Sequence, residues 1–308
     1  MQTKTIKKVI TAKLEGWLAS ITDEKLRKDV RGSLLVSGGC ITSMFQGLEV
    51  NDFDIYIQDM NVLVRLATYY CPTSVLDGRK KDDYIKERFP DYDPANPFWL
   101  DTEEPYAPKD LVRLETLKPD QVKLDIESEG IRKDAPEDPL EYQVVFLSQN
   151  AISLSGKIQI VLRFSGSPEE IHKNFDFIHA TNYFTFKDGL VTNVPALESI
   201  LTKELKYQGS LYPLTSIIRM KKFINRGWKI NAGEMLKIMF QISETDLKDI
   251  RVLEEQLIGV DIAYFGLLIE ALQTVEQEKI TSGYINTVID RIFNQYDEDH
   301  EANLERGE

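Results

Sequence analysis

The sequence is poor in the residues that build disulfide frameworks and zinc sites. Its 308 residues include 2 cysteines, Cys40 and Cys71, and 3 histidines that are scattered along the chain. A disulfide framework needs more cysteines than this, and a structural zinc site needs four clustered Cys or His ligands. These shortages argue against both stabilising devices. They also predict a chain that works in a reducing compartment, the cytoplasm.

Long apolar runs and an excess of basic residues are missing as well. No apolar stretch approaches the roughly 20 residues that cross a bilayer, and residues 1–8 are polar with no signal-like segment behind them. We therefore expect no membrane partner. The net charge is −13, so nucleic acid would not be attracted by bulk charge and would need a confined basic surface.

The remaining composition is typical of a soluble globular protein, with 42% hydrophobic and 28% charged residues. Strand and helix patterns mix up to about residue 194, and apolar residues at helical spacing follow from Pro195 onward. We predict an α+β domain over 1–194, a helical domain over 195–296 and an acidic tail over 297–308. Nine of the 12 prolines lie in 72–139, which predicts an inserted region at about 72–140.

A strand, a glycine turn, a short helix and a second strand are predicted in succession between residues 34 and 57. The apolar run 34–37 predicts the first strand, and Gly38-Gly39 ends it in a tight turn. A short helix is expected over 41–46, and alternation over 52–57 predicts the second strand. Backbone N–H groups at a glycine turn can approach phosphates closely, and the next helix aims its positive N-terminus at them.

Asp52 and Asp54 lie two positions apart on the second predicted strand, so their side chains share one face. Two carboxylates can bind one or two Mg²⁺ or Mn²⁺ ions, and paired metals hold the attacking and leaving oxygens of an in-line phosphoryl transfer. Ser43, one turn into the helix, offers a hydroxyl donor. An Asp-x-Asp pair that occurs alone often lies on a solvent-exposed strand face, and a Gly-Gly pair that occurs alone is usually only a turn. Their succession within one segment is more specific.

This order of residues resembles the nucleotidyltransferase signature of the DNA polymerase β-like superfamily, and most of all its CCA-adding enzyme and bacterial poly(A) polymerase group. That group reads Gly-Gly-x-Val-Arg-Asp-x-Leu-Leu-Gly-x-x-x-x-Asp-x-Asp. Six positions fall in register without a gap: Gly38, Gly39, Ile41, Gly47, Asp52 and Asp54. Thr42 and Ser43 stand where the group has Arg-Asp, and Ser43 instead suits the wider Gly-Gly-x-x-x-Ser pattern of the superfamily.

Two later segments resemble the same group in the same order. Residues 174–178 are similar to its Arg-Arg-Asp-Phe-Thr strand without the two arginines, and residues 212–230 to a helix running from Asp-Pro-Leu to Leu-Gly-Phe-x-Ile. The resemblance covers 34–57 and about 174–240, less than a third of the chain. It implies an α+β nucleotidyltransferase fold, a polymerase β-like palm with a mixed sheet, followed by an all-helical domain.

The resemblance also implies a third carboxylate on a neighbouring strand and a basic helix beside the nucleotide. Asp176 is the first candidate for the carboxylate, which would deprotonate or orient the acceptor hydroxyl or complete the second metal site. Asp125, on a predicted strand of the insertion, is the competing candidate. Arg219 and Lys222 lie on the predicted helix and would bind the triphosphate. An edge-strand aspartate and a solvated helix face are the plain alternatives.

These observations predict a metal-dependent nucleotidyltransferase that moves a nucleoside monophosphate from an NTP to an acceptor hydroxyl and releases pyrophosphate. Its predicted catalytic and metal-binding residues are Asp52, Asp54 and Asp176. Its predicted nucleotide-binding residues are Gly38, Gly39, Ser43, Arg219 and Lys222. An RNA end, a protein side chain or a small molecule fits as the acceptor. The alternative is a catalytically inactive binding or assembly protein that keeps this fold, of the kind also found in bacteriophages.

Overall fold

The computed structural model describes two compact units, Met1–Gln208 and Gly209–Glu308. The described residues are 1–70, 142–148 and 150–247, the backbone of 113–118, 121–125 and 131–132, and the single positions 252, 256, 283, 284, 286 and 287. The predicted acidic tail and most of the predicted insertion lie outside them. The domain boundary at residue 194 stays a prediction. None of the helices in these described ranges has both the length and the apolar composition needed to cross a membrane.

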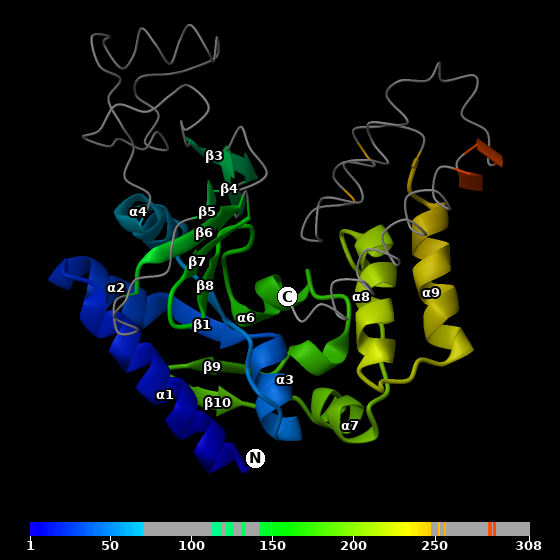
Figure 1. Cartoon of the computed structure of the whole chain (residues 1–308), viewed down its shortest axis with the longest axis horizontal. Coiled ribbons are helices and arrows are strands. Elements are labelled where there is room, and N and C mark those ends of the chain that lie inside the picture. Colours follow the sequence, from blue (N-terminus) through cyan, green and yellow to red (C-terminus); the bar gives the residue numbers. More distant parts are fainter. Residues whose placement is uncertain are drawn as a thin grey trace, which may run out of the picture. The chain divides into compact units, whose positions relative to one another are not determined.

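The first unit is built on an eight-stranded sheet with the order β10-β9-β1-β2-β8-β7-β6-β5 (Figure 1). Its strands are β1 (Leu34–Ser37), β2 (Phe53–Ile57), β5 (Ile131–Arg132), β6 (Val144–Ser148), β7 (Ala151–Leu154), β8 (Ile158–Val161), β9 (Tyr183–Thr185) and β10 (Gly189–Val191). β2 and β8 run parallel, and the other neighbours are antiparallel. β3 (Arg113–Lys118) and β4 (Gln121–Asp125) form a separate antiparallel pair. The predicted α+β class with a mixed sheet is confirmed.

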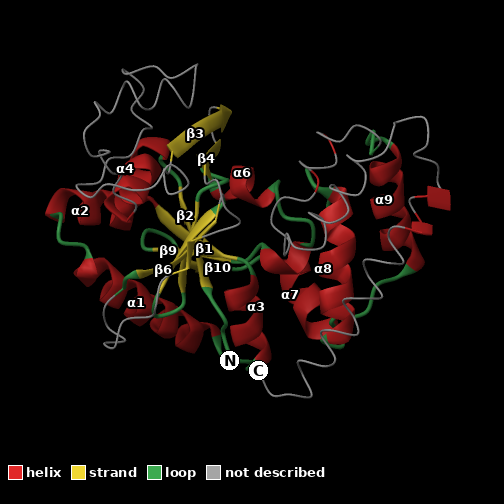
Figure 2. Cartoon of the chain, turned by 45° about the horizontal axis from the view of Figure 1, so that its top comes forward, coloured by secondary structure: helices red, strands yellow, loops and turns green. Residues whose placement is uncertain are grey.

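Helices flank this sheet, as Figure 2 shows. In the first unit they are α1 (Thr3–Ser20), α2 (Glu24–Ser33), α3 (Gly39–Gln46), α4 (Met60–Tyr70), α6 (Pro168–His172), a 3₁₀ turn (Ile178–Ala180) and α7 (Val194–Thr202). Side-chain caps define two of the starts. The Asp23 carboxylate accepts the Leu26 N–H at 2.9 Å to begin α2, and Ser167 and Glu170 form a reciprocal capping box at α6.

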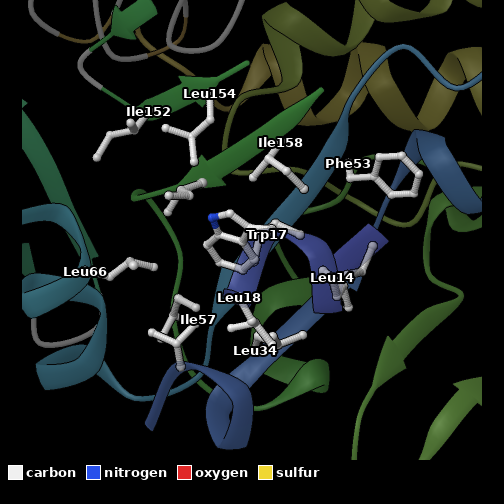
Figure 3. Close-up of a cluster of buried hydrophobic side chains, with 14 of the residues drawn as sticks. Leu14, Trp17, Leu18, Leu34, Phe53, Ile57, Leu66, Ile152, Leu154 and Ile158 are labelled. Atoms are coloured by element: carbon white, nitrogen blue, oxygen red, sulfur yellow. The ribbon is translucent and has the colours of Figure 1, made fainter. Parts of the chain in front are cut away.

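One face of the sheet carries the main hydrophobic core. α1 buries a stripe of apolar residues at helical spacing (Ile6, Ile10, Leu14, Trp17 and Leu18). These pack with residues from α2, α4 and the strands, and Trp17 lies at the centre of this cluster (Figure 3). Its indole N–H donates to the Tyr70 hydroxyl of α4 at 2.8 Å. Burying each large apolar side chain contributes about 1.5–3 kcal/mol, so this cluster is a large source of folding free energy.

The opposite face of the sheet is covered differently. Its buried apolar cluster consists of Leu35 of β1, Tyr56 of β2 and Ile171 of α6, with Phe175 and Tyr183 among the residues packed against it. α6 and the segment behind it therefore cover one end of β1 and β2. Polar side chains occupy the other end, where β1 leads into α3 and β2 begins.

The second unit contains α8 (Pro213–Asn225) and α9 (Ala232–Ser243) in its described part. Asn231 caps α9, since its side-chain oxygen accepts the Glu234 N–H at 3.0 Å. The Gln241 amide bonds both the N–H and the carbonyl of Ser210, at 3.2 and 2.6 Å, and so ties the start of the unit to α9. The helical spacing seen from Pro195 onward corresponds to α7, α8 and α9.

The sequence of residues 175–186 is strand-like, but a continuous strand does not form there. This stretch contains the 3₁₀ turn at 178–180 and the short strand β9 at 183–185. The physical reason is a distant partner. Phe177 forms an isolated bridge with Tyr207, and the N–H groups of Ile178 and Gln208 close bonds between these two segments. The chain is therefore paired away from the sheet before it turns back as β9.

Candidate functional site

Gly38 links β1 to α3 in a conformation that requires glycine. Its φ of 91° and ψ of −148° lie where side chains are rarely tolerated. Its N–H donates to the Ala180 carbonyl at 3.0 Å. A Cβ added here would lie 3.0 Å from Oδ2 of Asp54. The turn thus brings the backbone directly against a carboxylate of the predicted acid pair.

The first turn of α3 borders open space. A Cβ added to Gly39 would meet no atom within 4 Å. Ser43 is half-buried and lies four residues further on, so it faces the same side of the helix as Gly39. The first N–H groups of a helix lack partners within the helix, and together with the helix dipole they attract anions. The structure therefore gathers Gly38, Gly39 and Ser43 at one helix end, and their binding of phosphate stays a prediction.

Thr42 occupies the position where the resembled group has arginine, and the structure explains this departure. Its side chain is buried, and Oγ1 donates to the His179 carbonyl at 3.0 Å. An arginine could not fill this space without displacing the 3₁₀ turn. Thr42 thus fixes the turn to α3 instead of reaching a ligand.

The two predicted acids are electrostatically coupled at the start of β2. Asp52 is exposed just before the strand, and Asp54 is half-buried on it. Burial raises the pKa of Asp54 to about 7, and the negative charge of Asp52 adds to this rise. The thiol of Cys40 on α3 is close enough to Asp54 to interact with its charge. Burial and the negative charge of Asp54 both raise the pKa of this thiol. The thiol is therefore neutral at physiological pH and is no nucleophile.

The acid pair fits a divalent cation by its chemistry. Burial and the charge of Asp52 both disfavour the ionised form of Asp54, and a nearby double positive charge would stabilise it. Oxygen ligands of this kind are those that Mg²⁺ and Mn²⁺ prefer. Within the ranges that the structure describes, no group of three or more His, Cys, Asp or Glu side chains gathers as a metal site. Asp176 as a third ligand therefore stays a prediction.

Asp176 lies in the irregular segment behind α6 and not on a strand of the sheet. It is buried, and its carbonyl accepts the Gln208 N–H at 3.0 Å. Its charge acts on His179: burial lowers the pKa of that imidazole to about 4, and the negative charge of Asp176 opposes the change. The strand that does lie beside Asp54 is β8, where Gln159 is its register partner.

Sequence reasoning missed the polar network under the glycine turn. The Ser37 hydroxyl lies 3.0 Å from the Ala180 carbonyl, 2.9 Å from the Asn182 carbonyl and 2.9 Å from Nε2 of His172. Because the hydroxyl hydrogen is needed by a carbonyl, the His172 Nε2–H donates to Ser37. These bonds fix the turn to a segment more than 130 residues later in the chain. No local sequence pattern predicts hydrogen-bond partners at such a separation.

The other predicted residues lie on other elements of the chain. Asp125 ends β4, in the separate pair of strands, where its register partner is Arg113. Arg219 and Lys222 lie on α8 of the second unit. Their proposed contacts with the triphosphate stay predictions.

The solved structures that resemble the chain at low identity include two CCA-adding enzymes. The Bacillus stearothermophilus CCA-adding enzyme in complex with CTP is 12% identical, with a TM-score of 0.37 over 84% of this chain and 52% of that one. The Thermotoga maritima CCA-adding enzyme complexed with tRNA is 14% identical, with a TM-score of 0.35 over 85% and 56%. The chain thus spans about half the length of these structures. At such scores the likeness carries no argument about activity.

No curated protein matches the sequence. The profile of one family, Gad2, does match. It covers residues 8–203, more than half of the chain, and includes the glycine turn, the acid pair and the network beneath them. The chain therefore belongs to the Gabija anti-defense 2 family.

Proposed function

We propose that this protein is a metal-dependent nucleotidyltransferase that moves a nucleoside monophosphate from an NTP to an acceptor hydroxyl. The observation that carries the proposal is the contact of Gly38 with Asp54, where an added Cβ would lie 3.0 Å from Oδ2. A phosphate held by the turn and the start of α3 would necessarily lie next to the acid pair. This juxtaposition is what transfer at the α-phosphate requires.

The residues of this chain have separate tasks in the proposed reaction. Gly38, Gly39 and Ser43 hold the β- and γ-phosphates at the N-terminus of α3, where backbone N–H groups and the helix dipole favour negative charge. Asp52 and Asp54 hold Mg²⁺ or Mn²⁺, which when bound neutralises the charge that develops on the attacking and leaving oxygens. Asp176 is the proposed third carboxylate, which would complete the second metal site, and Arg219 and Lys222 are the proposed triphosphate contacts from α8.

The family name connects the reaction with a biological setting. Members are described as acting against Gabija, a property that we extend to this chain as part of the proposal. Modification of a Gabija component, or of a molecule on which Gabija depends, would give such an antagonist turnover instead of stoichiometric binding.

A catalytically inactive binding or assembly protein is the second candidate. The observation that favours it is that no cluster of three metal-ligating side chains forms in the described ranges. An antagonist that only binds its target would tolerate the loss of Asp52 and Asp54. The acid pair therefore separates the two candidates.

The deciding experiment compares the wild type with the Asp52→Ala/Asp54→Ala variant. Each protein is incubated with α-labelled NTPs, Mg²⁺ or Mn²⁺, purified Gabija proteins and total cellular RNA. We expect the double variant to lose label transfer by roughly a thousandfold, because it removes the charges that hold the cation. Glu49→Ala, which removes an exposed acid from the same loop, is the matched control and should transfer normally.

Thermal unfolding gives a second reading of the same site. If the site binds NTP with Mg²⁺, the ligand raises the Tm of the wild type and of Glu49→Ala but not of the double variant. Normal Gabija antagonism by the double variant, together with no transfer by the wild type, would favour the inactive binding protein.

A further inference from the structure

A row of side chains crosses the sheet from the acid pair toward its far edge. Gln159 of β8 is the register partner of Asp54, Ser153 of β7 is the partner of Gln159, and Phe146 of β6 is the partner of Ser153. Residues opposite one another on paired strands lie on the same face of the sheet. We call Gln159, Ser153 and Phe146 the acceptor strip. Its strands lie side by side in Figure 1.

The acceptor strip is accessible, unlike the residues that alternate with it. Gln159, Ser153 and Phe146 are each half-buried, whereas Ile152, Ile158 and Ile160 are fully buried in the main core on the other face. The Gln159 amide Nε2 lies 3.4 Å from the Ser153 hydroxyl. This bond is long, so both groups can turn to a ligand at little cost.

The geometry of the proposed transfer determines which side of the acids the acceptor must approach. In an in-line displacement, the attacking and leaving oxygens stand on opposite sides of the phosphorus. β2 lies between β1 and β8 in the sheet. Pyrophosphate leaves toward the glycine turn, which follows β1, so the attacking hydroxyl must come from the side of β8.

We propose that the acceptor strip binds the substrate that receives the nucleotide, and that this substrate is a hydroxyl-bearing protein side chain. The inference rests on the proposed function. In the step, the acceptor oxygen forms a bond to the α-phosphorus, the bond from that phosphorus to the bridging oxygen breaks, pyrophosphate leaves with the electron pair, and the hydroxyl proton passes to solvent.

The chemistry of the acceptor strip selects a protein in preference to RNA. The strip offers an amide, a hydroxyl and an aromatic ring, all without charge, and these suit the polar backbone and apolar side chains of a peptide. An amide and an aromatic ring can also hold an RNA base, but an RNA strand brings phosphates that Lys and Arg have to neutralise. Lys157, which precedes β8, is paired with Glu49 at 2.6 Å, and the chain as a whole carries −13.

The test uses the full chain and a Gln159→Ala/Ser153→Ala variant. Gln58→Ala, which removes an amide beyond the opposite end of β2, is the matched control. The rise in Tm with Mg²⁺ and each NTP measures donor binding without an acceptor. Label from α-labelled NTP, followed separately into purified Gabija proteins and into total RNA, measures transfer and the class of acceptor.

We expect the strip variant to keep the NTP-dependent rise in Tm and to lose about tenfold or more of its label transfer into protein, because hydrogen bonds to the acceptor alone are removed. Gln58→Ala should keep both. Full transfer by the strip variant would contradict the role of the acceptor strip in acceptor binding. Label found in RNA instead of protein, or in neither, would contradict the proposal that the acceptor is a protein. A wild type with neither a Tm rise nor transfer overturns the proposed function itself.

Discussion

The two faces of the central sheet are built from the same strands but do different work. On one face, Leu34, Ile57 and Ile158 pack with Trp17 into a continuous apolar core. On the other, the same strands present Ser37, Asp54 and Gln159 beside the glycine turn. Because strand side chains alternate, each strand contributes both to stability and to the site. The apolar packing on the core face holds the strands in place, and the strands in turn position the polar side chains on the other face.

The difference also appears in charge. The core face buries apolar groups whose transfer from water is favourable. The polar face holds groups that burial destabilises, with the pKa of Asp54 raised to about 7 and that of His172 lowered to about 4. The free energy gained by burying apolar groups on the core face thus offsets the cost of burying ionisable groups on the polar face. Substitutions on the core face should change stability, and substitutions on the polar face should change ligand binding.

The largest stability effect is expected on the core face. Trp17→Ala removes a fully buried indole and its bond to Tyr70, and we expect a loss of about 3–5 kcal/mol in the free energy of unfolding. Trp17→Phe keeps most of the ring and should cost less. Urea denaturation measures both. The Tm rise with NTP should persist in Trp17→Phe. Its disappearance would mean that core packing and ligand binding cannot be changed independently.

A smaller effect is expected from pH on the polar face. Burial lowers the pKa of His172 to about 4, and the charge of Glu169 opposes this; the ring also lies against Phe175 and Tyr183. The unfolded chain takes up this proton near pH 6.5, so the contribution of His172 to stability falls as the pH drops from 6.5 toward 4, while the raised pKa of Asp54 acts in the opposite direction. Between pH 6.5 and 5 the loss is up to about 2 kcal/mol.

His172→Gln isolates this contribution, since glutamine also offers an N–H to Ser37 and does not titrate. Denaturation of both proteins at pH 6.5, 6.0, 5.5 and 5.0 should show a flatter profile for the variant. Parallel profiles would show that His172 is not the group that loses stability, even though its pKa is shifted.

The smallest effect comes from a pair of glycines. Gly38 and Gly47 both have positive φ, 91° and 73°, but only at Gly38 would a Cβ meet Asp54. Gly47→Ala should cost about 1 kcal/mol from backbone strain, and Gly38→Ala about 1 kcal/mol more, because its conformation is nearly restricted to glycine. Only Gly38→Ala should reduce the Tm rise with NTP. Equal behaviour of the two variants would show that the turn does not control the acid pair.

The local part of this site was predictable from the sequence. The strand at 34–37, the glycine turn, the short helix and the strand at 53–57 all appear, with α3 beginning at Gly39 instead of residue 41. Each of these elements is encoded by a short pattern, namely an apolar run, a turn residue or an alternation. Asp52 and Asp54 were predicted on one face of a strand, but Asp52 precedes β2 and only Asp54 has a place on it.

The rest depends on distant pairing that short patterns do not carry. Gln159 lies beside Asp54 because β8 pairs with β2, and Ala180 lies beside Gly38 because of backbone bonds across the fold. Asp176 was expected on a strand because residues 174–178 resemble a strand of the known group, but Phe177 and Ile178 pair with the segment around Tyr207. Local propensity lost to these tertiary partners.

The pairings of β1 and β2 have a consequence for how the protein is made. Val36 pairs with Phe184 and Asp54 with Gln159, so the frame of the site joins residues more than 100 positions apart. The ribosome adds both aspartates to the growing chain long before it synthesises the strands that position them. Folding must also close these long loops before the contacts stabilise it, which slows the process. We expect the polypeptide to acquire ligand binding late in synthesis, after about residue 185 has emerged.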